Sequence, residues 1–343
     1  MKKIVKIGAI VIISAVNIFA QSKTTLINGA GATFPYPLYS KWFYEYAKID
    51  KTVNFNYQSI GSGGGIRQIL AKTVDFGASD AVMDDETLKK ATGKILHIPA
   101  TIGCVAIAYN IPEVAEKEIK LSGEIIADIY LGKIKKWNDK KIIAENPDIP
   151  SILFPDKNIV VARRADGSGT TAIFTDYLCS VSKEWQGKVG KGTSVNWPVG
   201  LGGKGNEGVT AIVKNTPYSI GYMELSYAIM NKLKTAAVKN KSGNYILPSE
   251  ESSSAAVASI KNIPEDYRVS IVNPEGENSY PISGFSWLLV YQKQDDKLKG
   301  QKIVEFLRWA ITDGQKYSKD LHYSPLPKNL QEKILKTINN IEY

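Results

Sequence analysis

The sequence TTLINGAGATFPYPLYSKWF, residues 24–43, changes from a strand-like to a helix-like pattern within a few residues. Thr24–Asn28 is typical of a short strand, whereas the apolar residues Leu38 and Trp42 fall on one face of a helix. Between them lies Gly29-Ala-Gly-Ala-Thr-Phe-Pro35, where glycines permit a tight turn and a proline suits the first turn of a helix. This stretch therefore predicts a strand, a tight turn and a helix in immediate succession.

The alternation of short strands and amphipathic helices continues along the chain. Further strands are expected at Val53–Gln58, Phe76–Ser79, Thr101–Asn110, Ile159–Ala162, Tyr218–Met223 and Ser286–Tyr291. Helices are expected at Pro37–Ala47, Ile66–Leu70, Ile125–Tyr130, Thr171–Leu178, Gly300–Ile311 and Leu330–Ile338. This order predicts an α/β fold with mostly parallel sheets. A chain of 343 residues is long enough for two domains, and because it has no linker-like segment we expect strands to cross directly between them.

Two further helix starts share the glycine-rich signature of Gly29–Pro35. Gly61-Ser-Gly-Gly-Gly65 precedes one expected helix, with Ser62 as its N-cap, and Asp166-Gly-Ser-Gly-Thr170 precedes another. A helix start leaves up to four backbone N–H groups unpaired at the positive end of the helix dipole, so it can bind an anion. One such start is ordinarily a structural cap. Three in one chain indicate a shared anion site if the fold brings them together.

Several motifs of phosphate- and ester-processing enzymes are missing from the sequence. Gly202-Gly-Lys-Gly205 lacks the hydroxyl residue that follows the lysine of a Walker A loop, and neither Ser62 nor Ser168 lies in a Gly-x-Ser-x-Gly elbow. His97 and His322 lie outside the glycine-rich loops, and we interpret His97 as a partly exposed structural residue. The sequence also has no Cys-x-x-Cys or His-x-x-x-His pair. We therefore expect no catalysis, no metal and no cofactor.

Residues 1–20 have the pattern of a secretory signal peptide. Lys2, Lys3 and Lys6 form a basic region, and the apolar run Ile7–Phe19 that follows is shorter than the roughly 20 residues needed to span a bilayer. Polar residues begin after Ala20. We expect cleavage near Ala20 and a soluble periplasmic protein; a buried N-terminal helix is the alternative.

The composition is that of a globular protein, with 43% hydrophobic and 22% charged residues. The formal net charge of +9 favours anionic ligands, but the basic residues are scattered, so we expect no nucleic-acid partner. Export would permit a disulfide between Cys104 and Cys179. The spacing does not decide whether they meet, and free thiols are the simpler expectation.

Seven stretches together resemble the phosphate-binding proteins of bacterial ABC-type phosphate importers. They run in the family's order, cover nearly the whole chain after residue 20, and are Gly29–Pro35, Tyr57–Gly64, Val74–Asp80, Ile129–Trp137, Arg163–Thr170, Gly200–Asn206 and Ser219–Tyr222. The resemblance implies a two-lobed, Venus-flytrap periplasmic-binding-protein fold with the ligand in the cleft between the lobes. Using the strand crossings as boundaries, we expect lobe one at 24–103 plus 282–343 and lobe two at 104–281.

The resemblance also implies a set of ligand-binding residues. Matched motif by motif, they are the backbone and hydroxyl of Thr33, the backbone N–H of Phe34, Ser62, Asp80 as an acceptor, Arg164, Ser168, Gly169 and Thr170, with Asp166 holding Arg164 in place. The planar fork of Arg164 suits two phosphate oxygens. The carboxylate of Asp80 needs a proton on the ligand, which phosphate carries near neutral pH and sulfate does not. Gly63 departs from the family, since many relatives have a serine there, and one hydroxyl near the site is thereby in doubt.

These features predict a protein that binds inorganic phosphate outside the cytoplasm and delivers it to an ABC-type phosphate importer. The implied partners are the inner-membrane permease subunits and, through them, the ATPase, and we expect a monomer. One alternative is a binding protein for another tetrahedral oxyanion, against which Asp80 argues. The other is a secreted phosphatase, against which the absence of a histidine from the glycine-rich loops argues.

Overall fold

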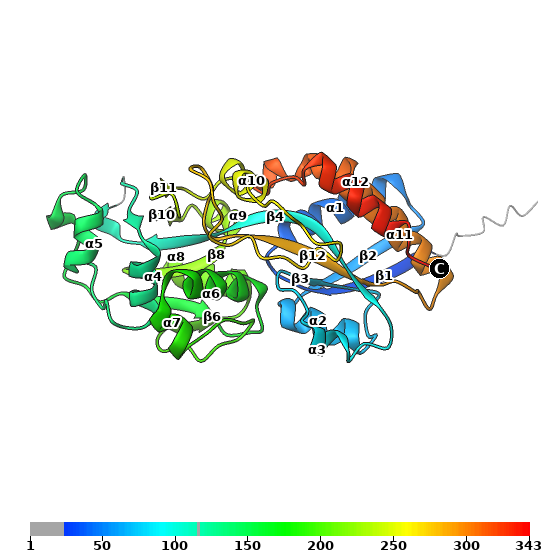
Figure 1. Cartoon of the computed structure of the whole chain (residues 1–343), viewed down its shortest axis with the longest axis horizontal. Helices are drawn as coiled ribbons and strands as arrows, with labels where there is room; N and C mark the ends of the chain where they lie inside the picture. Colours follow the sequence, from blue (N-terminus) through cyan, green and yellow to red (C-terminus); the bar gives the residue numbers. More distant parts are fainter. Residues whose placement is uncertain (1–23, 115–116) are drawn as a thin grey trace, which may run out of the picture.

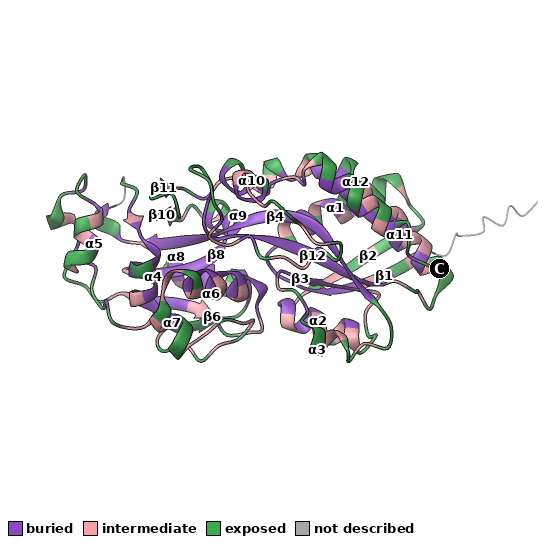
Figure 2. Ribbon diagram, in the orientation of Figure 1, coloured by how far each residue is buried: buried purple, intermediate pink, exposed green. Residues whose placement is uncertain are grey.

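The computed structural model describes residues 24–114 and 117–343, so the expected signal peptide lies outside the described residues. The molecule is elongated, with two α/β lobes arranged end to end (Figure 1). Two long strands, β4 (Ile95–Asn110) and β12 (Ser283–Tyr291), run through the middle and are buried along almost their whole length (Figure 2). These strands join the lobes. The prediction of an α/β fold is confirmed.

One mixed sheet passes through both lobes in the order β2-β1-β3-β12-β4-β8-β6-β7, and β9 pairs with β4 at its side. The first part of β4, up to Cys104, pairs with β12, and the rest, from Val105, pairs with β8. The Val105 N–H donates to the carbonyl of Ile282 at 2.8 Å, so both crossings between the lobes lie side by side. The residue boundaries of the lobes stay a prediction. The segment near Arg268 touches the first lobe, because its guanidinium donates to the carbonyl of Met83 at 3.0 Å.

The first lobe forms around a parallel trio of strands with β1 in the centre. Its elements are β1 (Thr25–Gly31), β2 (Val53–Ser59), β3 (Phe76–Ser79), α1 (Tyr36–Ile49), α2 (Ser62–Leu70), α3 (Asp85–Leu88), α11 (Lys297–Ile311) and α12 (Lys328–Ile338). Helices α1, α11 and α12 lie on one side of the sheet, and α2 and α3 on the other (Figure 1). Aromatic rings fill the space between sheet and helices, and the rings of Phe55 and Phe306 have centroids 4.4 Å apart.

The second lobe places β6 between β7 and β8, parallel to both. Its elements are α4 (Gly123–Tyr130), α5 (Lys140–Glu145), β6 (Val160–Arg164), α6 (Gly169–Val181), α7 (Lys183–Lys188), β7 (Leu201–Gly203), α8 (Gly205–Asn215), β8 (Ser219–Glu224), α9 (Leu225–Met230), β9 (Lys234–Thr235) and α10 (Glu250–Ala258). A small sheet adds β5 (Lys120–Leu121), β10 (Ala237–Lys239) and β11 (Tyr245–Ile246). Phe174 stacks on Tyr222 with centroids 4.3 Å apart, in a core beside the carboxyl end of β6.

The structure contains each strand and helix that the sequence predicted, with two differences. The sheet is mixed rather than mostly parallel, because β12 runs antiparallel to β3 and β4, and β4 runs antiparallel to β8. Strand β4 begins at Ile95 instead of Thr101. The added part of β4 contains Pro99, and a proline cannot donate a backbone hydrogen bond to a ladder. The strand accommodates it where the pairing register with β12 shifts, between Ser286 and Trp287.

Neither Cys104 nor Cys179 forms a disulfide, and His97 is a buried residue of β4. Cys104 and Cys179 are both free thiols, and the Cys104 Sγ donates to the carbonyl of Ser249 at 3.4 Å. We expected His97 to be partly exposed, which is wrong: it is buried in β4, and its Nε2 accepts the Met83 N–H at 3.1 Å. Burial lowers the pKa of His97 to about 4. None of the helices among the described residues has the length and apolar character needed to cross a membrane.

Candidate anion-binding site

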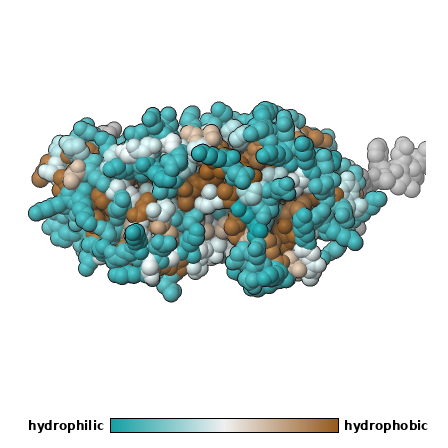
Figure 3. Space-filling model, viewed as in Figure 1, coloured by the Kyte–Doolittle hydropathy of each residue, from teal (hydrophilic) through white to brown (hydrophobic). Residues whose placement is uncertain are grey.

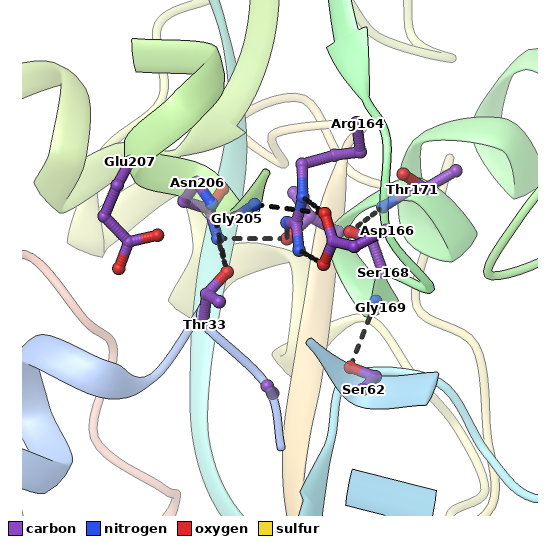
Figure 4. A network of polar contacts seen from close by, with 12 residues as sticks. Thr33, Ser62, Arg164, Asp166, Ser168, Gly169, Thr171, Gly205, Asn206 and Glu207 are labelled. Carbon is purple, nitrogen blue, oxygen red and sulfur yellow. Dashed lines mark hydrogen bonds and ion pairs between the residues drawn. The ribbon is translucent and has the colours of Figure 1, made fainter. Parts of the chain in front are cut away.

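Four helix starts converge between the lobes (Figure 4). Thr33 precedes α1 and Ser62 begins α2 in the first lobe, while Ser168 caps α6 and Asn206 lies in the first turn of α8 in the second. The sequence predicted three of these starts. It missed the start of α8, although Gly202–Gly205 was considered as a Walker A loop and Gly200–Asn206 is one of the stretches that carry the family resemblance. Since each start directs backbone N–H groups outward, their convergence creates a site rich in hydrogen-bond donors.

The hydroxyl group of Ser62, at the start of α2, makes a hydrogen bond that joins the two lobes. Its Oγ accepts the Gly169 N–H at 3.0 Å and the Asp80 N–H at 3.1 Å, and it lies 3.3 Å from the Asp80 Oδ2. We expected Ser62 to be the N-cap of α2, but Gly61 has that position, with φ of 86°, and Ser62 is the first helical residue. This shift turns the Ser62 hydroxyl across the cleft instead of back onto its own helix.

The carboxyl group of Asp80 is buried beneath Ser62. Its Oδ1 accepts a hydrogen bond of 2.7 Å from the Ser286 hydroxyl on β12, a residue that the sequence gave no reason to choose. Burial raises the pKa of Asp80 to about 7, although the hydrogen bond from Ser286 and the charge of Arg164 act in the opposite direction. Burial therefore disfavours ionisation of this carboxyl group, and in its ionised form it can accept a hydrogen bond from a protonated ligand.

Arg164, at the end of β6, is only 2% exposed and is held by Asp166 through two hydrogen bonds. The Arg164 Nε donates to Asp166 Oδ1 at 2.8 Å and the Nη2 to Asp166 Oδ2 at 2.6 Å. The Nη1 donates to the Thr170 hydroxyl at 3.3 Å. Because a guanidinium has five N–H groups, these contacts leave one N–H on each terminal nitrogen. That pair has the geometry to hold two oxygens of one anion.

Asp166 is itself well fixed. Burial alone would raise its pKa, but the hydrogen bonds and charge of Arg164 outweigh burial and lower the pKa below its usual range. Its Oδ1 also accepts the Gly205 N–H at 3.0 Å, which ties the start of α8 to the Arg164–Asp166 pair. The ion pair is therefore charged at neutral pH. Since Asp166 balances Arg164, the pair carries no net charge, and the other donors around the site are neutral N–H and O–H groups.

Gly169 must be a glycine because it meets the first lobe directly. A Cβ at this position would lie 2.4 Å from the Ser62 Oγ and 2.6 Å from the Asp80 Cβ. Just before it, Ser168 caps α6, with its Oγ accepting the Thr171 N–H at 3.0 Å. The Ser168 hydroxyl proton stays available, since the cap uses the oxygen as an acceptor.

Gly63 faces the backbone of the other lobe. Its N–H donates to the carbonyl of Gly167 at 2.9 Å, and a Cβ on Gly63 would lie 3.1 Å from the Gly167 Cα. The absence of a side chain at this position thus permits a close approach of two backbones.

Asn206 connects the remaining ligand candidates. Its Nδ2 donates to the Thr33 Oγ1 at 2.7 Å and to the Thr170 Oγ1 at 3.2 Å, and its backbone N–H donates to the Thr33 Oγ1 at 3.1 Å. On the first-lobe side, the carbonyl of Thr33 accepts from the Tyr227 hydroxyl at 2.6 Å and the carbonyl of Phe34 from Tyr323 at 2.7 Å. The structure thus brings Thr33 and Phe34 to the same cleft as the second-lobe candidates.

The site borders a larger hollow between the lobes. A cavity of about 580 Å³ extends from Asp80 and Gly63 past Met83 and Ile173 to Phe285. Figure 3 shows apolar surface in the middle of the molecule, between the mostly hydrophilic surfaces of the two lobes. Among the described residues, no group of three or more His, Cys, Asp or Glu side chains is arranged to hold a metal ion.

The nine predicted site residues therefore lie together, and sequence reasoning missed several of their partners. Asn206 and Gly205 belong to Gly200–Asn206, one of the stretches that carry the family resemblance, so a fourth glycine-rich helix start was a usable signal. Ser286, Tyr227 and Tyr323 had no comparable signal, because each lies far from the glycine-rich loops in sequence.

Comparisons with known proteins bear on the family and on the fold. A family model described as the PBP superfamily domain matches residues 20–313. The chain is 45% identical over 318 residues to the Phosphate-binding protein PstS of Haemophilus influenzae, which covers 92% of both chains. It is 42% identical over 345 residues to the Phosphate-binding protein PstS of Methanocaldococcus jannaschii, which covers 94% of this chain and 88% of the relative.

A comparison with solved structures shows that the fold is shared with a known protein. It is described as a high-affinity periplasmic phosphate-binding protein (PfluDING) bound with phosphate, and it matches with a TM-score of 0.73. The sequence identity is 21%, and the match covers 92% of this chain and 99% of the other. The likeness confirms the two-lobed fold predicted from the sequence.

Proposed function

The chain belongs to the family of PstS phosphate-binding proteins within the PBP superfamily, and from this premise we propose that it binds inorganic phosphate between its lobes and supplies it to an ABC-type importer. The observation that carries the proposal is the convergence of Arg164, Asp80 and four helix starts in one buried site. Such a site offers donors to every face of a tetrahedral anion and one acceptor for its proton.

We propose Thr33, Phe34, Ser62, Asp80, Arg164, Ser168, Gly169 and Thr170 as the phosphate-binding residues, with Asp166 as the residue that orients Arg164. The two unused N–H groups of Arg164 would bind two phosphate oxygens. The hydroxyl protons of Thr33, Ser168 and Thr170, together with backbone N–H groups at the helix starts, would reach the others. Neutral donors in a buried site stabilise an anion without the desolvation penalty of several extra cations.

Asp80 supports phosphate over a fully ionised oxyanion. A phosphate ion near neutral pH carries at least one proton, which it can donate to the Asp80 carboxylate. Sulfate has no proton, so it would place an oxygen against the carboxylate and leave both groups without a donor. An unmatched buried pair of this kind costs on the order of 1–3 kcal/mol, and more for charged groups.

We further propose that the protein binds phosphate in the periplasm without transforming it, as a monomer, after removal of residues 1–20. Its partners would be the inner-membrane permease subunits and the ATPase behind them. The contacts between Ser62 and Gly169 and between Thr33 and Asn206 support recognition of a closed form, because they exist only when the lobes meet. Ligand contacts from both lobes would shift the population toward that form.

The direct test is calorimetry on the mature chain, after any bound anion has been removed by unfolding and refolding. We expect one phosphate per chain, little heat from sulfate at equal concentration, and no hydrolysis of a generic phosphate ester. Equal binding of sulfate would favour a general oxyanion carrier, and ester turnover would favour a phosphatase. The anion released during unfolding identifies the ligand acquired in the cell.

A further inference from the structure

Asn206 holds a position in the site that neither the motifs nor the relatives' names assign. It is fully buried in the first turn of α8, and its side-chain amide lies between one candidate ligand residue of each lobe, Thr33 and Thr170. Figure 4 shows it directly opposite Thr33. A buried amide with every polar atom bonded is positioned with little freedom, so its orientation has consequences for the groups around it.

The orientation of the Asn206 amide follows from the contact on its other end. The Asn206 Oδ1 accepts the Glu224 backbone N–H at 3.0 Å. A backbone N–H can only donate, so the atom facing it must be the amide oxygen. The amide nitrogen therefore has to face Thr33 and Thr170, and it can only donate to them.

This arrangement leaves each of the two threonine hydroxyls with only its proton available for a further hydrogen bond. A hydroxyl has two acceptor lone pairs and one proton. The Thr33 Oγ1 accepts from both the backbone N–H and the Nδ2 of Asn206, at 3.1 and 2.7 Å. The Thr170 Oγ1 accepts from Asn206 Nδ2 at 3.2 Å and from Arg164 Nη1 at 3.3 Å. With both lone pairs occupied, each hydroxyl can offer only its proton.

We propose that Asn206 is a positioning residue that fixes the hydroxyl groups of Thr33 and Thr170 as hydrogen-bond donors toward the bound anion and at the same time joins the lobes. The inference rests on the proposed function, since it concerns the same site. It assigns specificity for anions to the direction of hydrogen bonds rather than to charge. An amide in this position rejects ligands that need an acceptor from the threonines.

The Asn206→Asp variant reverses this direction with little change of shape. The oxygen that faces Glu224 keeps its hydrogen bond, whereas the second oxygen replaces the nitrogen and accepts the threonine protons. Both hydroxyls would then present lone pairs to phosphate. We expect phosphate affinity at pH 8 to fall by about 100-fold or more, because two hydrogen bonds to a charged ligand are lost.

Lys204→Gln is the matched control for charge. It also changes the net charge by one unit, two residues away at an exposed position before α8. We expect it to weaken phosphate binding less than about threefold, as for an exposed and screened charge. A loss as large in Lys204→Gln as in Asn206→Asp would overturn the proposal, because charge alone would then explain the effect.

A double-mutant cycle tests whether Asn206 acts through the threonine. In a Thr33→Val background the hydroxyl is gone, so Asn206→Asp should cost at least about tenfold less than it does in the parent. Equal losses in both backgrounds would contradict the proposed role. Melting temperatures and circular dichroism establish that each variant is folded.

Asn206→Ala keeps the question answerable if the aspartate variant does not fold. It removes the amide without adding charge and frees the hydroxyls to rotate, so we expect a loss of about tenfold in phosphate affinity. An unchanged affinity in Asn206→Ala would overturn the inference. Failure of the parent to bind phosphate would instead refute the proposed function, so the two outcomes are distinguishable.

Discussion

Replacing Asp80 by asparagine should change which anion the protein selects more than it changes the stability of the fold. In the parent, Oδ1 accepts from the Ser286 hydroxyl at 2.7 Å, and Oδ2 lies 3.3 Å from the Ser62 Oγ. In Asp80→Asn the amide oxygen should keep the contact with Ser286. The amide nitrogen then takes the place of Oδ2, because the amide oxygen keeps the shorter of the two hydroxyl contacts, and the Ser62 hydroxyl, which donates to Oδ2 in the parent, loses that acceptor. A carboxylate acceptor is thereby replaced by a donor.

The expected change in the binding free energy of sulfate follows from a single buried contact, the one between a sulfate oxygen and the Asp80 side chain. Sulfate should gain about 1–3 kcal/mol of binding free energy, or roughly 5- to 150-fold in affinity, because a repulsive contact becomes a hydrogen bond. Phosphate should change less, since the lost acceptor for its proton is offset by removal of a negative charge. Calorimetry at pH 8 with each anion measures the ratio. Asp156→Asn, which makes the same chemical change at an exposed site paired with Lys136, should leave both affinities unchanged.

The pH dependence of the stability of the unliganded protein supplies a second measurement on Asp80. Burial raises the pKa of Asp80 to about 7. A raised pKa means that the folded protein holds the proton more tightly than the unfolded chain does, so this contribution to stability is full below the unfolded pKa of 3.8 and is lost as the pH rises from there through about 7. Without ligand, Asp80→Asn should therefore match the parent below about pH 4 and be more stable than the parent at pH 8. An unchanged sulfate-to-phosphate ratio would refute the reasoning on selectivity, and unfolding of the variant at both pH values would make Asp80 a structural residue.

Three further outcomes follow from the same site. Arg164→Ala should weaken phosphate binding by about 1.5–3 kcal/mol or more, the contribution of hydrogen bonds to charged groups, and calorimetry showing unchanged affinity would place the site elsewhere. Gly169→Ala should lower phosphate affinity by at least about tenfold with a smaller effect on the melting temperature of the unliganded protein, because its Cβ would lie 2.4 Å from the Ser62 Oγ and keep the lobes apart; small-angle scattering with phosphate would detect the more open form. Burial raises the pKa of Glu224 to about 8, so its contribution to stability is full below the unfolded pKa and falls as the pH rises toward 8. Glu224→Gln should therefore flatten the decline of melting temperature between pH 5 and pH 8, and an identical pH profile would contradict the raised pKa.

The sequence was informative where one residue type is required by local geometry. The serine cap at 168 reflects a helix start, which leaves a local pattern, whereas the contact that requires glycine at 169 is made with Ser62 and Asp80 of the other lobe. The strands and helices were predictable for the same reason, since their periodicity is local. The extra length of β4 was not, because Pro99 argues against a strand and only the pairing with β12 accommodates it.

The hydrogen-bond partners of the site residues could not be predicted from the sequence, because these contacts depend on tertiary packing. Ser286 is one polar residue in a buried strand, and nothing near it in sequence indicates that its hydroxyl meets Asp80 from another part of the chain. Tyr323 is 289 residues from Phe34, whose carbonyl it binds. Contacts at such separations follow from the path of the chain through both lobes, which a local pattern cannot specify.

The same packing links the proposed closure of the lobes to the proposed recognition of the anion. The Ser62 Oγ uses one lone pair for a backbone N–H of its own lobe and the other for the Gly169 N–H of the opposite lobe. The Thr33 Oγ1 fills both lone pairs with donors of Asn206, also from the opposite lobe. When the lobes separate, the Ser62 lone pair that accepts from Gly169 and both lone pairs of the Thr33 hydroxyl become free, so these hydroxyls lose their fixed direction. Closure would therefore fix the Thr33 hydroxyl as a donor toward the cleft, and an anion that binds between the lobes would stabilise the closed state.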